Sequence, residues 1–231
     1  MRKTHSPCTG VLLTLLVILL MSTVLSAGEL VDMQKNTEEA SQALVNEPTS
    51  EESNSMRILF IGNSHTYVND MPAILQEIAA ADGYQVEVTM LAHSRFYLLE
   101  HVQQPDTEFN IRYGHYDYVV LQEHAHPFGP VEDYEQGAAI LAGWAREAGS
   151  KVVLYETWSQ KNNPAGQAEI TQANTDLAEK LDAILAPVGE RWQQKIAEEP
   201  EVELYASDGA HASVEGSTLA AQVIWESIRE D

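Results

Sequence analysis

The stretch of sequence that decides the fold is Arg57-Ile58-Leu59-Phe60-Ile61-Gly62-Asn63-Ser64-His65-Thr66. Its first six residues form a short apolar run that ends in glycine, which is typical of a buried parallel strand. Further apolar runs of strand length follow along the chain. They lie at Val86 to Leu91, Tyr118 to Leu121, Val152 to Tyr155 and Val202 to Tyr205. The sequence therefore predicts five strands.

Segments with apolar residues at helical spacing separate these runs. They predict helices at Ala73 to Asp82, Tyr97 to Val102, Val131 to Ala148, Gln167 to Leu185 and Ser213 to Arg229. Strands that alternate with helices form a parallel sheet that is covered on both faces. We therefore expect one domain over 56–231, with an α/β fold. Its predicted architecture is a three-layer α/β/α sandwich around a five-stranded parallel sheet of flavodoxin-like order.

The first 27 residues (1–27) have the pattern of a signal peptide. Arg2 and Lys3 supply a positive start, and an almost unbroken apolar run follows from Val11 to Met21. This pattern predicts a protein that is exported to the periplasm or the extracellular space. Because the apolar run can be extended to Leu25, an uncleaved membrane anchor is the alternative interpretation.

Residues 28–55 are rich in Glu, Ser, Asn and Thr, which predicts an acidic, disordered linker. The only cysteine, Cys8, precedes the apolar run, so a chain without its leader has no disulfide and no thiolate nucleophile. The formal net charge is −22, from 35 acidic and 13 basic residues. Such a surface repels phosphate backbones and anionic lipid. We therefore expect no nucleic acid as a partner and no stable membrane partner after cleavage of the leader.

Polar residues follow several of the predicted strands. Ser64 comes after the first strand, Gln122 after the third, and Asp208 and His211 after the fifth. Because the carboxyl ends of parallel strands meet at one edge of a sheet, we expect these side chains to lie close together. A serine hydroxyl becomes a nucleophile when a histidine accepts its proton, and a carboxylate orients that histidine. The pattern therefore predicts Ser64 as nucleophile, His211 as general base and Asp208 as its partner.

Plain structural roles are the alternative for each of these residues. A serine at this position can simply cap the following helix, and an Asp-Gly pair favours a turn. Acyl transfer further requires hydrogen-bond donors for the developing oxyanion. We expect the backbone N–H of Ser64 and the side-chain amide of Gln122 to supply them, with an ordinary strand-end role as the alternative for Gln122.

Several sequence blocks resemble the SGNH/GDSL hydrolases. Gly62-Asn63-Ser64 resembles the first block of that family, and Asp208-Gly209-Ala210-His211 resembles the last. The match is closest to an uncharacterised bacterial branch with GNS(F/H)T, VVLQE, PVGxxW and LYxSDGxH motifs. The corresponding stretches here begin at Gly62, Val119, Pro187 and Leu204. The resemblance covers roughly 57–225 and implies a serine esterase that acts through a Ser-His-Asp triad and needs no cofactor.

The resemblance also implies a second block, in which the backbone N–H of a glycine points into the oxyanion hole. No glycine lies between Leu91 and Leu98, and Ser94 is the nearest small residue. We therefore expect the Ser94 N–H in this role, with backbone strain if the position requires a positive φ. Substrates of the family range over carbohydrate acetyl esters, short acyl esters and lysophospholipids. Together with export, this favours a small-molecule or glycan ester as the substrate.

A substrate pocket is expected around these blocks. The residues predicted to line it are Asn63, His65, Glu123, His124 and Trp158. His124 and His126 suggest one alternative, a metal-assisted hydrolase, although no third ligand at a typical spacing accompanies them and we predict no metal site. A second alternative is a non-catalytic glycan-binding module on the same fold, because the second-block glycine is missing.

Overall fold

The apolar runs pair into one sheet, in which every strand is parallel to its neighbours. The strands are β1 (Ser55–Gly62), β2 (Gln85–Ala92), β3 (Tyr118–Leu121), β4 (Lys151–Tyr155) and β5 (Ile184–Ala186). Their order across the sheet is β2-β1-β3-β4-β5, which is the flavodoxin-like order predicted from the sequence. The sheet therefore reverses its winding between β1 and β3, and in folds of this kind ligands bind outside the carboxyl ends of the strands at that point.

The computed structural model describes residues 54–231. The predicted signal peptide (1–27) and nearly all of the predicted linker (28–55) lie outside these residues. Strand β1 begins at Ser55, one residue before the predicted start of the domain. No helix within residues 54–231 combines the length and the apolar character needed to cross a bilayer.

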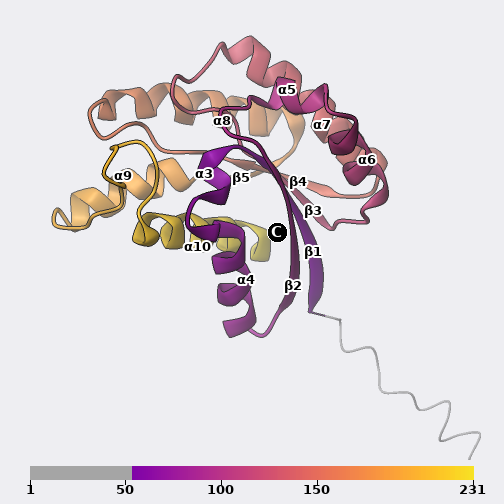
Figure 1. Cartoon of the computed structure of the whole chain (residues 1–231), viewed down its shortest axis with the longest axis horizontal. Helices are drawn as coiled ribbons and strands as arrows, with labels where there is room; N and C mark the ends of the chain where they lie inside the picture. Colours follow the sequence, from indigo (N-terminus) through magenta and orange to yellow (C-terminus); the bar gives the residue numbers. More distant parts are fainter. Residues whose placement is uncertain (1–53) are drawn as a thin grey trace, which may run out of the picture. The chain divides into compact units, whose positions relative to one another are not determined.

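Helices cover both faces of the sheet, as Figure 1 shows. One face carries α4 (Met71–Ala81), α9 (Val188–Glu198) and α10 (Val214–Arg229). The other carries α5 (Leu98–Val102), α6 (Pro105–Tyr113), α7 (Val131–Glu147) and α8 (Gln167–Leu181). Shorter turns complete the chain, namely α3 (Ser64–Tyr67), η1 (Val68–Asp70) and η2 (Pro164–Gly166). This is the predicted three-layer α/β/α sandwich.

Side chains of successive strand residues enter two separate cores. On β1, Ile58 and Phe60 pack against α4 and α10, whereas Leu59 and Ile61 pack against the helices of the opposite face. All four are fully buried. Because a strand inside a three-layer sandwich is covered on both faces, its sequence is continuously apolar rather than alternating. Each such side chain contributes about 1.5–3 kcal/mol relative to an exposed position.

The fifth strand lies at a different place from the one predicted. Val202 to Tyr205 does not join the sheet, and only an isolated antiparallel bridge links Tyr205 to Ala212. Strand β5 is instead Ile184–Ala186, which the sequence assigned to the end of a long helix. Helix α8 ends just before Asp182, which has a left-handed backbone (φ +47). A residue in this conformation commonly terminates a helix and turns the chain away from its axis. The predicted helix Gln167 to Leu185 is therefore a helix followed by a strand.

Helices α6 and α9 were not predicted. Helix α9 begins directly after Pro187, where the fixed φ of proline suits the start of a helix. Its second residue is Gly189, and a Cβ at this position would lie 2.2 Å from the Thr157 carbonyl oxygen. The glycine of the Pro187-Val188-Gly189 segment thus allows α9 to approach the end of β4 closely.

Candidate active site

A tight turn after β1 presents Ser64 at the carboxyl edge of the sheet. Ser64 is the first residue of α3, and Asn63 caps this short helix. The Asn63 Oδ1 accepts from the His65 N–H (3.1 Å), and the Asn63 carbonyl accepts from the Thr66 N–H (3.0 Å). Gly62 is required because a Cβ there would lie 2.5 Å from the Gln122 Oε1. The turn therefore depends on close packing that only glycine permits.

A second tight turn, between α9 and α10, carries Asp208 and His211. The Ala206 N–H donates to the His211 carbonyl (2.8 Å) and closes the loop. Inside it, the Asp208 Oδ1 accepts from the N–H groups of Ala210 (2.9 Å) and His211 (3.0 Å). Gly209 has a φ of +68, a conformation that glycine adopts at little steric cost. These contacts hold the Asp208 carboxylate beside the His211 ring.

The two turns bring three side chains into one row of hydrogen bonds. The His211 Nε2 lies 2.8 Å from the Ser64 Oγ, and the His211 Nδ1 lies 2.6 Å from the Asp208 Oδ2. The hydrogen bond from His211 and that from the Ala210 N–H hold the pKa of the Asp208 carboxyl well below its usual value. An ionised carboxylate on Nδ1 retains a proton there and leaves Nε2 free to accept from the serine.

The segment after β4 anchors the Asp208–His211 loop. The Trp158 Nε1 donates to the Ala210 carbonyl (2.8 Å), and the Lys161 N–H donates to the Gly209 carbonyl (2.9 Å). The Trp158 ring is fully buried and stacks on Trp192 at 3.9 Å. The prediction that Trp158 lines the substrate pocket is therefore wrong. Its indole ring lies in the core, and its N–H fixes the loop that holds His211.

Gln122 has a different role from the predicted one. Its Oε1 accepts from the Asn63 N–H (2.8 Å) and from the Thr66 Oγ1 (2.9 Å), while its Nε2 donates to the Glu123 carbonyl. The Asn63 N–H is a donor and needs the amide oxygen as its acceptor, whereas the Glu123 carbonyl is an acceptor and needs the amide nitrogen as its donor. The two partners therefore fix the orientation of the amide. The side chain is 1% exposed. The Oε1 and one N–H of the amide therefore bond within the Ser64 turn, and Gln122 does not line the pocket beside Ser64.

Asn63 and Glu123 are also buried supports and do not line the pocket. The Asn63 Nδ2 donates to the Phe96 carbonyl at 3.0 Å. The Glu123 carboxylate accepts from the N–H groups of Leu98 (3.2 Å) and His124 (2.5 Å). Burial raises the pKa of Glu123 to about 7. This carboxyl therefore joins the start of α5 to the loop after β3.

The loop after β2 contains one residue with a left-handed backbone. The sequence suggested Ser94 for this conformation, and the structure shows it at the next residue, Arg95. Arg95 has a φ of +65, whereas Ser94 does not have a positive φ. The turn closes with a hydrogen bond from the Phe96 N–H to the His93 carbonyl (3.1 Å). Arg95 also lines the pocket beside Ser64, and Ser94 does not. The left-handed residue of this loop, which also lines the pocket, is therefore Arg95 and not Ser94.

A pocket of about 460 Å³ opens above the Ser64–His211 pair. His65 and His124, which the sequence assigned to a substrate pocket, line it, and the His124 ring stacks on Tyr97 at 4.5 Å. Burial holds the pKa of His65 well below its usual value, so this ring, 5.2 Å from the His211 ring, stays neutral. Sequence reasoning missed several lining residues, and for three of them the only signal was a position after a strand. These residues are Arg95, Tyr97 and Gln160.

His126 lines the same pocket, and its ring lies 5.0 Å from that of His65. Burial lowers the pKa of His126 to about 4, so this imidazole is also neutral near pH 7. Within residues 54–231, no group of three His, Cys, Asp or Glu side chains is arranged to hold a metal ion. His124 and His126 therefore have no third ligand of these types in the part of the chain that the structure describes.

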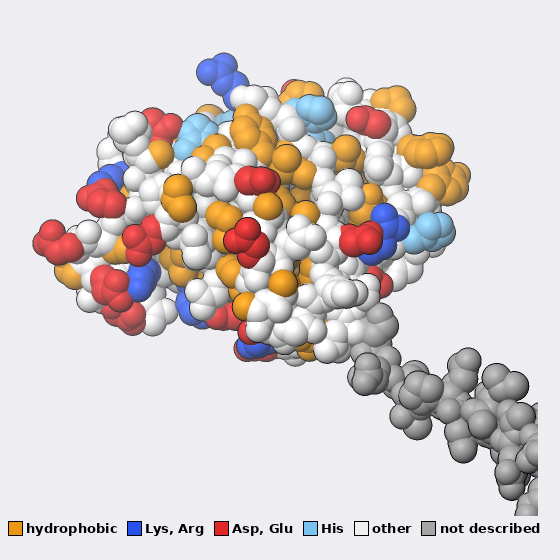
Figure 2. All heavy atoms as spheres, turned by 60° about the horizontal axis from the view of Figure 1, so that its bottom comes forward, with side chains coloured by type: hydrophobic (Ala, Val, Ile, Leu, Met, Phe, Trp, Pro, Cys, Tyr) orange, Lys and Arg blue, Asp and Glu red, His pale blue; other side chains and the backbone are white. Residues whose placement is uncertain are grey.

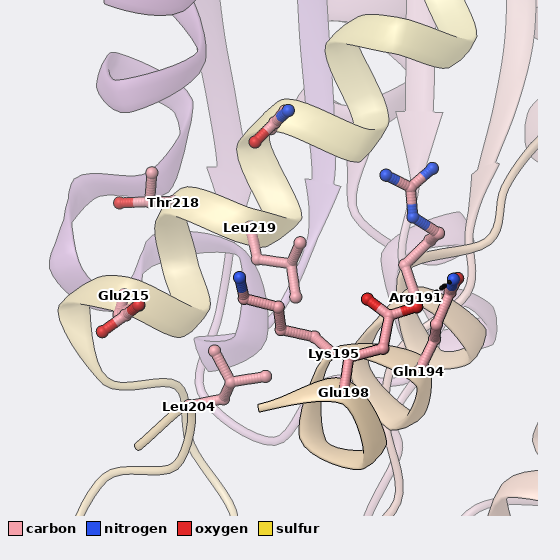
Figure 3. Close-up of a pocket in the computed structure, with 9 residues that line it drawn as sticks. Arg191, Gln194, Lys195, Glu198, Leu204, Glu215, Thr218 and Leu219 are labelled. Carbon is pink, nitrogen blue, oxygen red and sulfur yellow. Dashed lines mark hydrogen bonds between the residues drawn. The ribbon is translucent and has the colours of Figure 1, made fainter. Parts of the chain in front are cut away.

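A larger hollow of about 600 Å³ lies between α9 and α10 (Figure 3), and Ser64 is not among the residues that line it. Its two cations are already paired. Arg191 lies 3.5 Å from Glu226, and Lys195 lies 2.7 Å from Glu199. The hollow contains Thr218 but no histidine that could activate this hydroxyl. Size alone therefore does not identify the reactive site.

Comparison with solved structures finds close matches to the whole fold. A protein from Slackia heliotrinireducens, described as an SGNH hydrolase, is 30% identical; the match covers 75% of this chain and 99% of that one, with a TM-score of 0.65. A lipase/acylhydrolase from Enterococcus faecalis is 15% identical, with 76% and 96% covered and a TM-score of 0.62. An acetylxylan esterase from Geobacillus stearothermophilus is 15% identical, with 75% and 94% covered and a TM-score of 0.57.

These matches determine the class of the protein. At 30% identity over nearly the whole of a protein described as an SGNH hydrolase, the chain belongs to the SGNH/GDSL hydrolases. It is therefore an enzyme of the carboxylic ester hydrolase class. The two more distant structures show the shared fold alone. No protein-family model and no curated protein matches the chain.

Proposed function

We propose that the chain is a serine esterase in which Ser64 is the nucleophile. The observation that carries this proposal is the continuous row from the Ser64 Oγ through His211 to the Asp208 carboxylate, with contacts of 2.8 and 2.6 Å. Distances of this size allow direct proton transfer between serine and imidazole. Asp208 stays ionised throughout, because its lowered pKa disfavours protonation.

The reaction proceeds in two halves. The Ser64 Oγ attacks the ester carbonyl carbon while His211 Nε2 accepts the hydroxyl proton. The carbon–oxygen bond to the alcohol then breaks, and His211 returns the proton to the leaving alcohol. Water next attacks the acyl-Ser64 ester with His211 again accepting a proton, which releases the carboxylic acid and restores the serine.

The Ser64 and Arg95 backbone N–H groups are the proposed oxyanion donors. The N–H groups of His65 and Thr66 are already taken by Asn63, which leaves that of Ser64 as the donor at this turn. The Arg95 turn is tied to the nucleophile turn, because the Asn63 Nδ2 donates to the Phe96 carbonyl. Loss of one such donor typically costs about 10²–10³ in turnover.

The proposed substrate is an acyl ester on a glycan, with acetyl esters as the simplest case. A second hollow of about 480 Å³ adjoins the Ser64 pocket and shares His126, Pro127 and Gln160 with it. Two adjoining hollows suit a substrate that extends beyond a small acyl group. The export that the N-terminal residues predict would bring the protein to glycans outside the cytoplasm, and an acetylxylan esterase has the same fold.

A fluorophosphonate probe tests the proposal, because it labels activated serines. Wild type should be labelled and should release acetate from an acetylated oligosaccharide, and both signals should be lost in Ser64→Ala. Ser207→Ala is the matched control, since Ser207 is an exposed serine beside Asp208 that lies outside the row. Labelling that persists in Ser64→Ala would refute the assignment. Activity that a chelator abolishes would favour metal-assisted hydrolysis, and binding of the glycan without cleavage would favour a non-catalytic module.

A further inference from the structure

Arg95 differs from every other cation in the part of the chain that the structure describes. Ten Lys and Arg residues lie within residues 54–231, and eight of them form ion pairs with carboxylates. On the face drawn in Figure 2, most Lys and Arg side chains lie against acidic ones. Arg146 donates to the Leu181 carbonyl. Among the Lys and Arg residues that the structure describes, Arg95 alone has a side chain with no ion-pair or hydrogen-bond partner, and it lines the pocket beside Ser64.

None of the residues within 54–231 that line the pocket is acidic, although the chain carries a net charge of −22. Two acidic groups that contact its lining residues are paired within their own loops. Asp208 faces His211 at 2.6 Å, and Glu100 accepts from the Tyr97 N–H at 2.9 Å. The neutral imidazoles of His65 and His126 add no charge. Among the described residues that line this pocket, Arg95 is therefore the only one that carries a permanent charge.

The backbone holds Arg95 in place at some cost. A left-handed conformation disfavours a residue with a Cβ by roughly 1–2 kcal/mol relative to glycine, yet an arginine occupies this position with a φ of +65. Two hydrogen bonds fix the loop to the nucleophile turn, one from the His93 N–H to the Gly62 carbonyl (3.1 Å) and one from Asn63 to Phe96 (3.0 Å). The loop that carries Arg95 is thus joined directly to the turn that carries Ser64.

We propose that Arg95 selects esters that carry a carboxylate near the scissile bond. This inference rests on the proposed esterase function and narrows its substrate class to acidic esters. A planar guanidinium matches a carboxylate through two parallel hydrogen bonds. A single cation suits a singly charged group, because the strongly acidic surface repels ligands of higher negative charge. The carboxylate can belong to the acyl part, as in a hemisuccinate, or to the alcohol part, as in a uronic acid.

Paired substrates that differ only in this charge test the proposal. The acyl arm compares 4-nitrophenyl hemisuccinate with its neutral methyl-succinate analogue. The alcohol arm compares release of acetate from an acetylated oligogalacturonate and from the same oligosaccharide with its carboxylates methylated. In one arm, wild type should show a kcat/KM about tenfold higher for the charged member. This preference should weaken at high salt, because the Arg95 guanidinium is exposed.

Substitutions of Arg95 then test whether this residue causes the preference for charged esters. Arg95→Gln should reduce the ratio of charged to neutral kcat/KM about tenfold, and Arg95→Lys should retain part of it, since it keeps the charge without the planar fork. Arg146→Gln is the control, because it removes the same charge from the C-terminal end of α7, outside the pocket. Its ratio should equal that of wild type.

The possible failures are distinguishable. Hydrolysis of neutral esters with no charge preference in either arm overturns this inference and leaves the esterase function intact. A preference that survives in Arg95→Gln does the same. If wild type cleaves none of the four substrates and Ser64 is not labelled by a fluorophosphonate, the esterase function fails and this inference fails with it.

Discussion

The row that contains Ser64, His211 and Asp208 contrasts with the network of Gln122 and Asn63 that lies beneath it. The row is open to solvent, with the side chains of His211 and Asp208 exposed by 34% and 49%. Gln122 and Asn63 are each 1% exposed, and their polar atoms are paired with neighbouring groups. Both regions are polar and lie at the same edge of the sheet.

The difference separates reacting from positioning groups. A reacting group must meet substrate and exchange protons, so it cannot be fully buried. A positioning group is most effective when it is buried, because a hydrogen bond that is lost there leaves an unsatisfied polar atom and costs about 1–3 kcal/mol. Substitutions in the row should therefore change activity without changing stability, and substitutions in the network should change both.

The largest effect is expected for Ser64→Ala. Removal of the hydroxyl abolishes the acyl-enzyme route, and kcat/KM for a 4-nitrophenyl ester should fall roughly 10⁵- to 10⁶-fold. Because Ser64 is half-buried and its hydroxyl contacts only His211 among the described side chains, the thermal midpoint should change by less than about 3 °C. A large loss of stability would show that Ser64 belongs to the supporting network.

A somewhat smaller effect is expected for Asp208→Asn. The amide cannot stabilise an imidazolium, and it can hold His211 in the wrong tautomer, so kcat should fall about 10⁴-fold. Steady-state kinetics over pH 5–9 measure this change. Asp176→Asn is a suitable control. Asp176 lies on α8, where its carboxylate accepts from Gln172, and it forms no hydrogen bond with Ser64, His211 or Asp208. If the two variants had similar kcat, Asp208 would have no role in orienting His211.

Gln122→Leu should lower the stability of the protein, and it should lower activity indirectly, through the same disturbance of the fold. It leaves the Asn63 N–H and the Thr66 hydroxyl without their buried acceptor, at a cost of about 2–4 kcal/mol. Chemical unfolding should show this loss, and kcat should fall through displacement of the Ser64 turn. The exposed Gln172→Leu is the control for the same change in composition. An unchanged free energy of unfolding would contradict the network role.

The smallest effect concerns the pH dependence of stability. Burial raises the pKa of Glu123 and of Glu156 to about 7, from an ordinary value near 4.5. Between these values the folded state binds more protons than the unfolded state, so stability is lost as pH rises through 7. The free energy of unfolding of Glu123→Gln and of Glu156→Gln should therefore rise by about 1–3 kcal/mol relative to that of wild type when the pH is raised from 5 to 8.

Denaturant unfolding at the two pH values measures this gain. Glu201→Gln provides the control, because Glu201 is exposed and should show no such shift in relative stability. A constant difference between wild type and Glu123→Gln across the range would mean that the carboxylate is ionised in the fold at pH 5. In that case its hydrogen bonds from Leu98 and His124 outweigh its burial.

Four of the five strands could be predicted from the sequence, whereas the flavodoxin-like order was expected for a fold of this kind and cannot be read from periodicity. The continuous apolar runs of β1, β3 and β4 reflect burial on both faces, which is a local pattern. β5 could not be predicted in the same way, because Ile184, Leu185 and Ala186 suit a helix as well as a strand. Their pairing with β4 decides the outcome. Asp208 and His211 were expected after a strand, whereas their loop follows α9 and is held by the segment after β4.

The sequence by itself determined the α/β architecture, the acidic charge, and the candidate row of Ser64, Asp208 and His211. The architecture depends on the periodicity of residues that are close together in the chain, the charge depends on composition, and the three candidates were chosen by their chemistry and by their positions after predicted strands. Only the tertiary structure decided that Gln122 supports the Ser64 turn and that Arg95 lines the pocket. The direction of a side chain depends on neighbours that are distant in sequence, as with Asn63 and Gln122, which are 59 positions apart. Ser64 and His211, which are 147 positions apart, meet only because the chain folds.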